Sequence, residues 1–161
     1  MKKEQHFTYP FPPFIDESSK ILILGSFPSI KSFENNFYYT HPKNQFWKLL
    51  AGVFDEETPK SLEEKRVFLQ KHHIALWDII QSCKRENSSD TNLKDVTPND
   101  IKQLLQNYPN IQQIFFTSKT AQKIYQKHFS FDLPTAYLPS PSPAYAVLSF
   151  EEKLNRWKEI F

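Results

Sequence analysis

The chain of 161 residues is 39% hydrophobic and 16% aromatic, which supplies the core of one folded domain and excludes an intrinsically disordered protein. Its formal net charge of +2 is too small to indicate nucleic-acid binding by itself, so any basic surface would be local. The single cysteine, Cys83, excludes an internal disulfide and a four-cysteine iron–sulfur cluster, and it favours a reducing, cytoplasmic setting.

The N-terminal residues 1–19 carry charges but no apolar run of the kind that a secretory signal has. No other segment is long and apolar enough to span a bilayer. We therefore expect one cytoplasmic domain over residues 1–161, with residues 1–19 as an N-terminal extension and no contact with a membrane.

Strands and helices alternate along the rest of the chain. The apolar run at residues 20–25, KILILG, is typical of a parallel strand that is buried on both faces. Further strands are predicted at residues 73–80, 111–117 and 135–139, and helices at residues 44–54, from Ser61, at 118–129 and from Ser149. This alternation predicts the α/β class, as a three-layer α/β/α sandwich around a four-stranded, mainly parallel sheet.

Some helix starts carry side chains that can cap the first turn. Three pairs have the spacing of a capping box: Ser61 with Glu64, Thr97 with Asp100, and Ser149 with Glu152. Pro98 would then occupy the first position of a helix, which proline favours. The polar residues 81–95 before it are expected to form a long exposed loop.

The loops at the carboxyl ends of the predicted strands are the expected place for a ligand, because open sheets of this class bind ligands there. Three segments leave those ends: residues 26–44, the residues after Asp78, and the residues after Tyr137.

Several common chemistries do not fit these loops. No two of the five histidines have the i,i+4 spacing around a glutamate that a metal-binding helix uses, so no protein-bound metal is expected. Ser26 follows Gly25 directly but lacks the second glycine of a hydrolase elbow. Gly25 and Gly52 are the only glycines, which is too few for a glycine-rich phosphate loop.

The aromatic segment, residues 36–47 with the sequence NFYYTHPKNQFW, is suited to a flat ligand. Its rings could stack on a base, and the Asn44 carboxamide could read a base edge or hold a water molecule. Phe46 and Trp47 could instead begin a helix and pack inward, and both readings stay open for the rings before Thr40. Asn44 could also cap that helix, which is compatible with a catalytic role.

The serine–proline loop, residues 138–146 with the sequence LPSPSPAYA, combines three prolines with Ser140 and Ser142. The prolines stiffen the backbone, so the hydroxyls could bind phosphate oxygens at little entropic cost. The alternative is a plain connector to the last helix. A stripe of lysines on the preceding helix is expected to be ordinary solvated surface: Lys119, Lys123 and Lys127.

Four segments together resemble the uracil-DNA glycosylase superfamily: LILGSFPS, YYTHPKNQFW, IALWDII and LPSPSPAYA. The likeness is greatest to the hypoxanthine (deoxyinosine) DNA glycosylase branch, and it runs in order over nearly the whole chain. The resemblance implies a four-stranded parallel sheet between helices. It also implies a monofunctional enzyme that hydrolyses the N-glycosyl bond of a damaged base flipped out of DNA, without a metal or other cofactor.

The chain departs from patterns within this superfamily at three places. Many members hold the attacking water with the third residue of the first motif, which is Phe27 here, and the hypoxanthine branch relies instead on the asparagine that matches Asn44. Leu138 stands where the best-known uracil enzymes have histidine, which argues against an efficient uracil-specific enzyme. Thr117 and Ser118 stand where the branch typically has asparagine and glycine.

The resemblance assigns Asn44 as the catalytic residue. Our hypothesis is that Asn44 orients the water, while backbone N–H groups after Gly25 stabilise the departing base. The predicted base pocket consists of Gly25, Ser26, Phe27, Tyr38, Tyr39 and His41. The predicted DNA-binding residues are Pro28, Ser29, Lys43, Ser140, Pro141, Ser142 and Tyr145. Asp78 and Asp90 are possible secondary participants.

The expected partner is DNA that contains a damaged base, bound by a monomer. Three alternatives stay open: a uracil or mismatched-base DNA glycosylase, a catalytically silent protein that binds damaged or single-stranded DNA, and a hydrolase of free nucleosides. The last fits least, because a free nucleoside offers a stiff serine–proline loop little to hold.

Overall fold

The computed structural model describes residues 5–8, 12–26, 37–85 and 94–161. Its centre is a parallel sheet of four strands in the order β3-β2-β6-β7. These strands are β2 (Ile21–Gly25), β3 (Ile74–Asp78), β6 (Gln113–Phe116) and β7 (Thr135–Tyr137). The predicted four-stranded sheet is confirmed, and its strands pair in parallel throughout.

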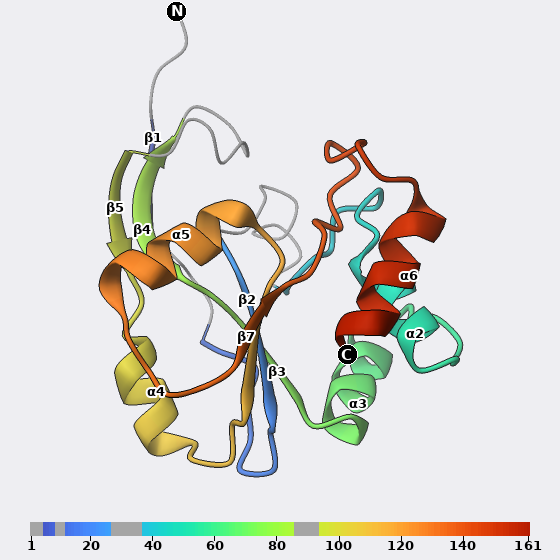
Figure 1. The fold of residues 1–161 in the computed structure, drawn as a ribbon, viewed down its shortest axis with the longest axis horizontal. Helices are drawn as coiled ribbons and strands as arrows, with labels where there is room; N and C mark the ends of the chain where they lie inside the picture. Colours follow the sequence, from blue (N-terminus) through green and yellow to red (C-terminus); the bar gives the residue numbers. More distant parts are fainter. Residues whose placement is uncertain (1–4, 9–11, 27–36, 86–93) are drawn as a thin grey trace, which may run out of the picture.

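Helices cover both faces of this sheet, as Figure 1 shows. The helices α4 (Ile101–Asn107) and α5 (Lys119–His128) lie on one side. On the other side lie α2 (Phe46–Val53), α3 (Leu62–Lys71) and α6 (Phe150–Ile160). The three-layer α/β/α sandwich is therefore confirmed, and Leu22, Ile23 and Leu24 of the strand β2 at its centre are fully buried.

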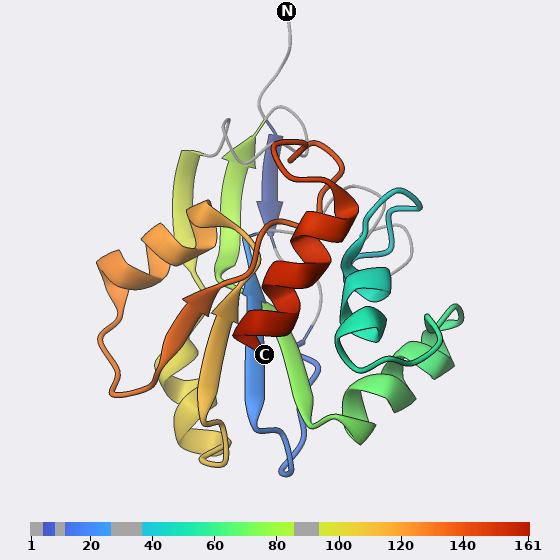
Figure 2. The same cartoon turned by 45° about the vertical axis from the view of Figure 1, so that its right-hand side comes forward.

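A second sheet was not predicted. The strands β1 (Gln5–Thr8), β4 (Ile80–Arg85) and β5 (Lys94–Pro98) form an antiparallel sheet in the order β1-β4-β5, which Figure 2 shows beside the central sheet. The prediction of one exposed loop over residues 81–95 is therefore wrong for residues 81–85 and 94–95. These polar residues become strands because their backbones pair with one another, and β4 also pairs with β1 far away in the sequence, which their composition does not reveal.

The helix starts follow the capping predictions at two of three places. The hydroxyls of Ser61 and Ser149 accept the N–H groups of Glu64 and Glu152, and the second pair completes a capping box. The prediction for the third pair is wrong, because Pro98 pairs in β5 and the side chain of Asp100 caps α4.

The helices α2 and α6 pack closely. Through this contact α6 supports two of the loops predicted for the site, the aromatic segment and the serine–proline loop. A Cβ atom on Gly52 would lie 2.6 Å from Leu154 Cδ1, so the helices approach at a residue that has no side chain. Trp157 of α6 is fully buried, its ring lies 5.8 Å from that of Phe46, and its indole N–H donates to the Pro139 carbonyl at 2.9 Å. The last helix thereby holds both the start of α2 and the loop after β7.

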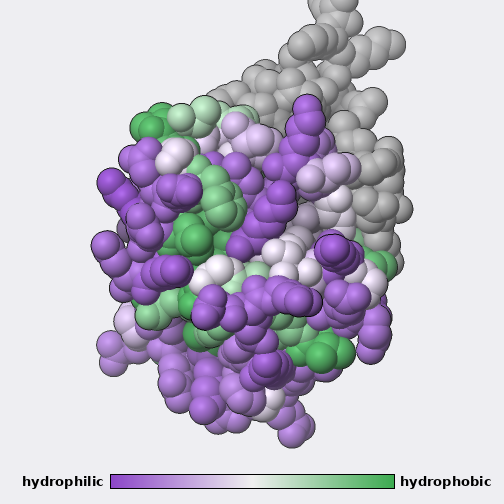
Figure 3. Space-filling model, turned by 90° about the vertical axis from the view of Figure 1, so that its right-hand side faces the viewer, coloured by the Kyte–Doolittle hydropathy of each residue, from purple (hydrophilic) through white to green (hydrophobic). Residues whose placement is uncertain are grey.

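The outer surface of α2, α3 and α6 is largely hydrophilic. Figure 3 shows apolar side chains there as separate patches among polar ones, as the outermost layer of a sandwich requires. In the part of the chain that the structure describes, no helix is long and apolar enough to cross a membrane.

Candidate active site

The candidate site lies at the carboxyl ends of the parallel strands, where the backbone ladder continues beyond each strand. Ile79 and Ile80 donate their N–H groups to the carbonyls of Gly25 and Ser26 at 2.8 and 3.1 Å. On the other flank of β2, Thr117 donates to the Leu24 carbonyl at 3.2 Å. The residues that follow the strands are therefore held at one rigid edge.

Gly25 brings two polar side chains onto this edge. It pairs with Asp78 across the β2–β3 ladder, and a Cβ atom on Gly25 would lie 2.4 Å from Asp78 Oδ1 and 3.1 Å from the Tyr39 hydroxyl. Such distances leave no room for any side chain at this position. The Asp78 side chain, 5% exposed, and the Tyr39 hydroxyl thus come close to the Gly25 backbone.

Tyr39 is held firmly in this position. Its ring stacks on that of Phe46 with a centroid distance of 3.9 Å and an interplanar angle of 7°. Its hydroxyl forms a hydrogen bond of 2.8 Å with Thr117 Oγ1 at the end of β6. Its φ angle of 54° lies in the left-handed region that few residues other than glycine adopt. Such backbone strain requires support from the surrounding packing, which these two contacts supply.

The other rings of the aromatic segment pack into the protein. Phe37, Phe46 and Trp47 are all buried, which confirms the inward packing considered for the last two. Tyr38 is 3% exposed and donates its hydroxyl to the Pro12 carbonyl at 2.9 Å. This burial corrects the expectation that Tyr38 offers a ring face to a base, and among the described tyrosines of the segment it leaves Tyr39 as the ring at the site edge.

Asn44 closes a turn and holds the start of α2. Its N–H donates to the His41 carbonyl at 2.9 Å, and its side-chain Oδ1 accepts the N–H of Phe46 at the same distance. The helix α2 begins at Phe46 with Gln45 at its N-cap, so the prediction of Asn44 as the capping residue is wrong, although its side chain accepts the first N–H group of the helix. The half-buried carboxamide is fixed in orientation, which is also what a water-holding group needs.

His41 and Lys43 stand on the outside of the same turn. Both are exposed, and His41 Nδ1 accepts the backbone N–H of Lys43 at 3.1 Å. Lys43 is therefore available to a polyanion, while His41 lies on the rim of the turn rather than in an enclosed pocket.

The serine–proline loop lies against this turn, as the views in Figures 1 and 2 agree. The Gln45 N–H donates to the Pro141 carbonyl at 2.9 Å, which joins the loop to the residue after Asn44. Pro141 is buried, so it positions the loop and does not present a surface for DNA, which corrects its expected role. The structure thus brings the two predicted loops together.

The two serines use their oxygen atoms as acceptors inside this loop. Ser140 Oγ accepts the N–H of Ser142, and Ser142 Oγ accepts the N–H of Ala144, both at 3.2 Å. Each hydroxyl keeps its own hydrogen, which can be donated to a phosphate oxygen. The Tyr145 ring is half-buried, and Val147 beyond it is 81% exposed.

Lys153 is a site residue that the sequence analysis missed. It lies on the buried face of α6, and its ammonium donates to Gln45 Oε1 at 2.8 Å and to the Ser142 carbonyl at 3.1 Å. Burial lowers its pKa below the ordinary value. Its position four residues before Trp157 on the apolar face of α6 was the available signal.

Other predicted residues fall outside this arrangement. Phe27, Pro28, Ser29 and Asp90 lie outside the described residues. The lysines at 119, 123 and 127 are exposed, as expected for solvated surface. Over the ranges that the structure describes, no group of three or more histidine, cysteine, aspartate or glutamate residues could hold a metal ion.

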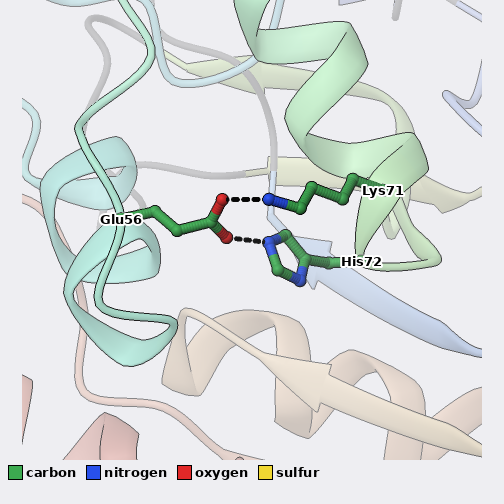
Figure 4. A network of polar contacts seen from close by, with 3 residues as sticks. All are labelled: Glu56, Lys71 and His72. Carbon is green, nitrogen blue, oxygen red and sulfur yellow. Dashed lines mark hydrogen bonds and ion pairs between the residues drawn. The ribbon is translucent and has the colours of Figure 1, made fainter.

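A separate ion cluster lies near the amino-terminal edge of the sheet, where α3 leads into β3. Figure 4 shows the Glu56 carboxylate bonded to Lys71 and His72. The hydrogen bond from Lys71 is the main cause that lowers the pKa of Glu56, and that from His72 adds to it. A hollow of about 350 Å³ beside it is lined mainly by the segment after α2 and by α3, so it is remote from the candidate site. This cluster fastens the segment after α2 to α3.

Comparison with known proteins shows which class of protein has this sequence and fold. The family model described as the uracil DNA glycosylase superfamily matches residues 12–161. Two proteins named hypoxanthine DNA glycosylase, from Methanosarcina barkeri and Methanosarcina acetivorans, are 34% and 33% identical to the chain over 152 residues. Each alignment covers 94% of this chain and 96% of the relative.

A solved structure agrees with these sequence matches. The solution NMR structure of a candidate uracil DNA glycosylase from Methanosarcina acetivorans has a TM-score of 0.81 and 30% identity, and it covers 97% of this chain and 96% of its own. The class that fold and site define is the DNA glycosylase, a hydrolase of N-glycosyl bonds that takes DNA as substrate. The chain belongs to the uracil DNA glycosylase superfamily.

Proposed function

We propose that the protein is a monofunctional DNA glycosylase that removes hypoxanthine from a deoxyinosine flipped out of DNA. The observation that carries this proposal is the hydrogen bond of 2.9 Å between the Gln45 N–H and the Pro141 carbonyl. It puts an oriented carboxamide, on Asn44, beside a loop with two hydroxyl donors. The Asn44 carboxamide, which would hold the water, and the serine hydroxyls, which would bind phosphates, could then act on the same nucleotide. The names of both Methanosarcina relatives support the choice of hypoxanthine.

In this proposal Asn44 orients the attacking water. Its Oδ1 already accepts the Phe46 N–H, so the second lone pair of that oxygen accepts a hydrogen bond from water directed at C1′ of the sugar. The backbone N–H groups after Gly25 stabilise the negative charge that develops on the departing base. The carboxylate pair of ordinary glycosidases is not required.

In this proposal the polar side chains beside Gly25 recognise the damaged base. Hypoxanthine presents an N–H beside a carbonyl, whereas adenine presents a bare nitrogen beside an amine. A hydroxyl of the Tyr39–Thr117 pair donates to the carbonyl, and the Asp78 carboxylate accepts the N–H. Adenine reverses both groups, which is worth about 1–3 kcal/mol of discrimination for a two-bond contact.

Uracil is the nearest competing substrate, because it presents the same N–H and carbonyl pattern as hypoxanthine. The serine hydroxyls, Lys43 and Tyr145 contact the backbone of the damaged strand in either case. Hypoxanthine ranks above uracil in this proposal because of the names of the two Methanosarcina relatives. Both bases belong to one chemical class of deaminated bases.

An abasic-site assay tests the proposal. Duplexes that carry a single hypoxanthine, xanthine, uracil or adenine are incubated with excess enzyme, and strand cleavage at abasic sites is measured after alkali. We expect the hypoxanthine duplex to react fastest and the adenine duplex to remain intact. Faster release of uracil would make the protein a uracil glycosylase, and binding without any abasic product would make it a silent damage-binding protein.

The protein is further proposed to act as a monomer in the cytoplasm. Sedimentation of the free protein and of its complex with a duplex tests the first point. A stoichiometry of two chains per lesion would overturn it.

A further inference from the structure

Lys153 is a charged residue in an apolar place. Its side chain is 1% exposed, on the face of α6 that also carries Trp157. A buried ammonium normally requires a carboxylate partner, because its desolvation is costly. Among the described residues Lys153 makes no ion pair, and its partners are the Gln45 amide oxygen, the Ser142 carbonyl and the face of the Tyr145 ring.

These neutral partners come from the two loops of the candidate site. Gln45 directly follows Asn44 and lies at 2.8 Å through its Oε1, and the Ser142 carbonyl lies at 3.1 Å. The ring centroid of Tyr145 lies 5.5 Å from the ammonium. One buried charge therefore contacts the aromatic segment and the serine–proline loop at the place where their backbones are already joined.

The Ser142 carbonyl receives a second hydrogen bond, from the N–H of Tyr145 at 3.1 Å. Lys153 thus fixes the turn that carries both Ser142 and Tyr145. An uncharged apolar side chain could fill the same volume without the desolvation cost, so packing alone gives no reason for a lysine here.

We propose that Lys153 is a positioning residue that locks Asn44 to the serine–proline loop, and that a DNA phosphate bound on this loop supplies the negative charge that its ammonium lacks in the free protein. This inference rests on the proposed function, because it assigns a DNA backbone to that loop. A charge that lies in a poorly screened interior acts on a phosphate over a longer distance than an exposed lysine does.

The test compares Lys153→Met with Lys153→Arg. Methionine has similar length and no charge, and arginine restores the charge with a different shape. Lys158→Met is the matched control, because Lys158 is an exposed lysine of the same helix. Binding to a duplex that carries an uncleavable abasic analogue is measured across a range of salt concentrations, together with single-turnover release of hypoxanthine.

We expect Lys153→Met to weaken binding about 10-fold, to lower the slope of log affinity against log salt by about one, and to slow base release. Lys153→Arg should restore the slope, and Lys158→Met should leave affinity, slope and rate unchanged. A folded Lys153→Met variant with the slope and the rate of the parent protein would overturn the proposal. A loss of rate with an unchanged slope would also overturn it, because a purely structural residue gives that result.

A second measurement covers a Lys153→Met variant that does not fold. Hydrogen exchange at the Gln45 amide, which donates to the Pro141 carbonyl, is followed in the parent protein and in Lys153→Arg with and without the duplex. We expect slower exchange when the duplex is bound, and an unchanged rate would contradict the proposal. Neither binding nor exchange requires catalysis, so both measurements can be made even if no lesion is excised.

Discussion

The amino-terminal and carboxyl-terminal ends of the central sheet differ in how their charged side chains are paired. Near the amino edge, the Glu56 carboxylate is bonded to Lys71 and His72, so the Lys71 ammonium supplies its counter-charge. At the carboxyl edge, Lys153 is buried with neutral partners only, among the described residues. A pair that is complete in the free protein contributes to the fold, whereas a buried charge without a counter-ion is better explained by a ligand. Substitutions at each edge test whether the charged groups divide in this way.

The largest expected effect is that of Gly25→Ala. The added Cβ would lie 2.4 Å from Asp78 Oδ1, so the carboxylate and the neighbouring backbone must move. We expect a loss of about 1–3 kcal/mol in the free energy of unfolding and a fall of about 100-fold or more in single-turnover base release. Denaturant unfolding and the abasic-site assay measure the two quantities. An active, fully stable variant would mean that the close approach at Gly25 serves no purpose.

A smaller effect is expected for Tyr39→Phe. The variant keeps the ring stacked on Phe46 and removes the hydroxyl that forms the hydrogen bond with Thr117. We expect base release to fall about 10-fold, and the preference for hypoxanthine over adenine to weaken by a similar factor. The assay on both duplexes measures the ratio.

Tyr125→Phe is the control for this change. The Tyr125 hydroxyl is buried without a hydrogen-bond partner in the described structure, so its removal should leave activity and stability nearly unchanged. If the two variants behave alike, the Tyr39–Thr117 pair has no role in reading the base.

The smallest effect is expected at the opposite edge, for Glu56→Gln. Base release should not change, and Tm at neutral pH should fall by only about 2 °C, because exposed ion pairs contribute little. The pKa of Glu56 is lowered in the folded protein, so its contribution is present above its ordinary pKa of 4.5 and is lost as the pH falls through the folded value. The difference in Tm from the parent should therefore vanish in acid.

Glu57→Gln is the matched control, because Glu57 is an exposed neighbour that forms no ion pair within the described structure. Thermal melts of both variants between pH 7 and strongly acidic conditions provide the comparison. A loss of base release in Glu56→Gln would contradict the division between the two edges.

Local sequence patterns predicted the parts of the fold that depend on local interactions. The run of apolar residues in β2 identifies a strand that is buried on both faces. Ser61 and Ser149 mark helix starts, because each hydroxyl caps an N–H group only three residues later. The strands β4 and β5 were missed because pairing with β1 and with each other, rather than a hydrophobic pattern, makes them strands.

The sequence predicted which loops form the site, but it did not predict the contacts between them. Asn44 and the serine–proline loop could be identified from their residue types, whereas the contact between Tyr39 and Thr117 joins residues far apart in the sequence. Lys153 was missed because lysines on helices usually lie in solvent, and its place on the apolar face of α6 does not show that its ammonium reaches Gln45 and Ser142.

The most direct test of the central claim is single-turnover release of hypoxanthine by the parent protein and by Asn44→Ala, with Asn155→Ala as a control on an exposed asparagine of α6. We expect Asn44→Ala to reduce the rate by about 100-fold or more, while its affinity for the duplex changes little and stability falls by about 1 kcal/mol through the lost hydrogen bond to the Phe46 N–H. An Asn44→Ala variant that releases hypoxanthine at the rate of the parent protein would contradict the account.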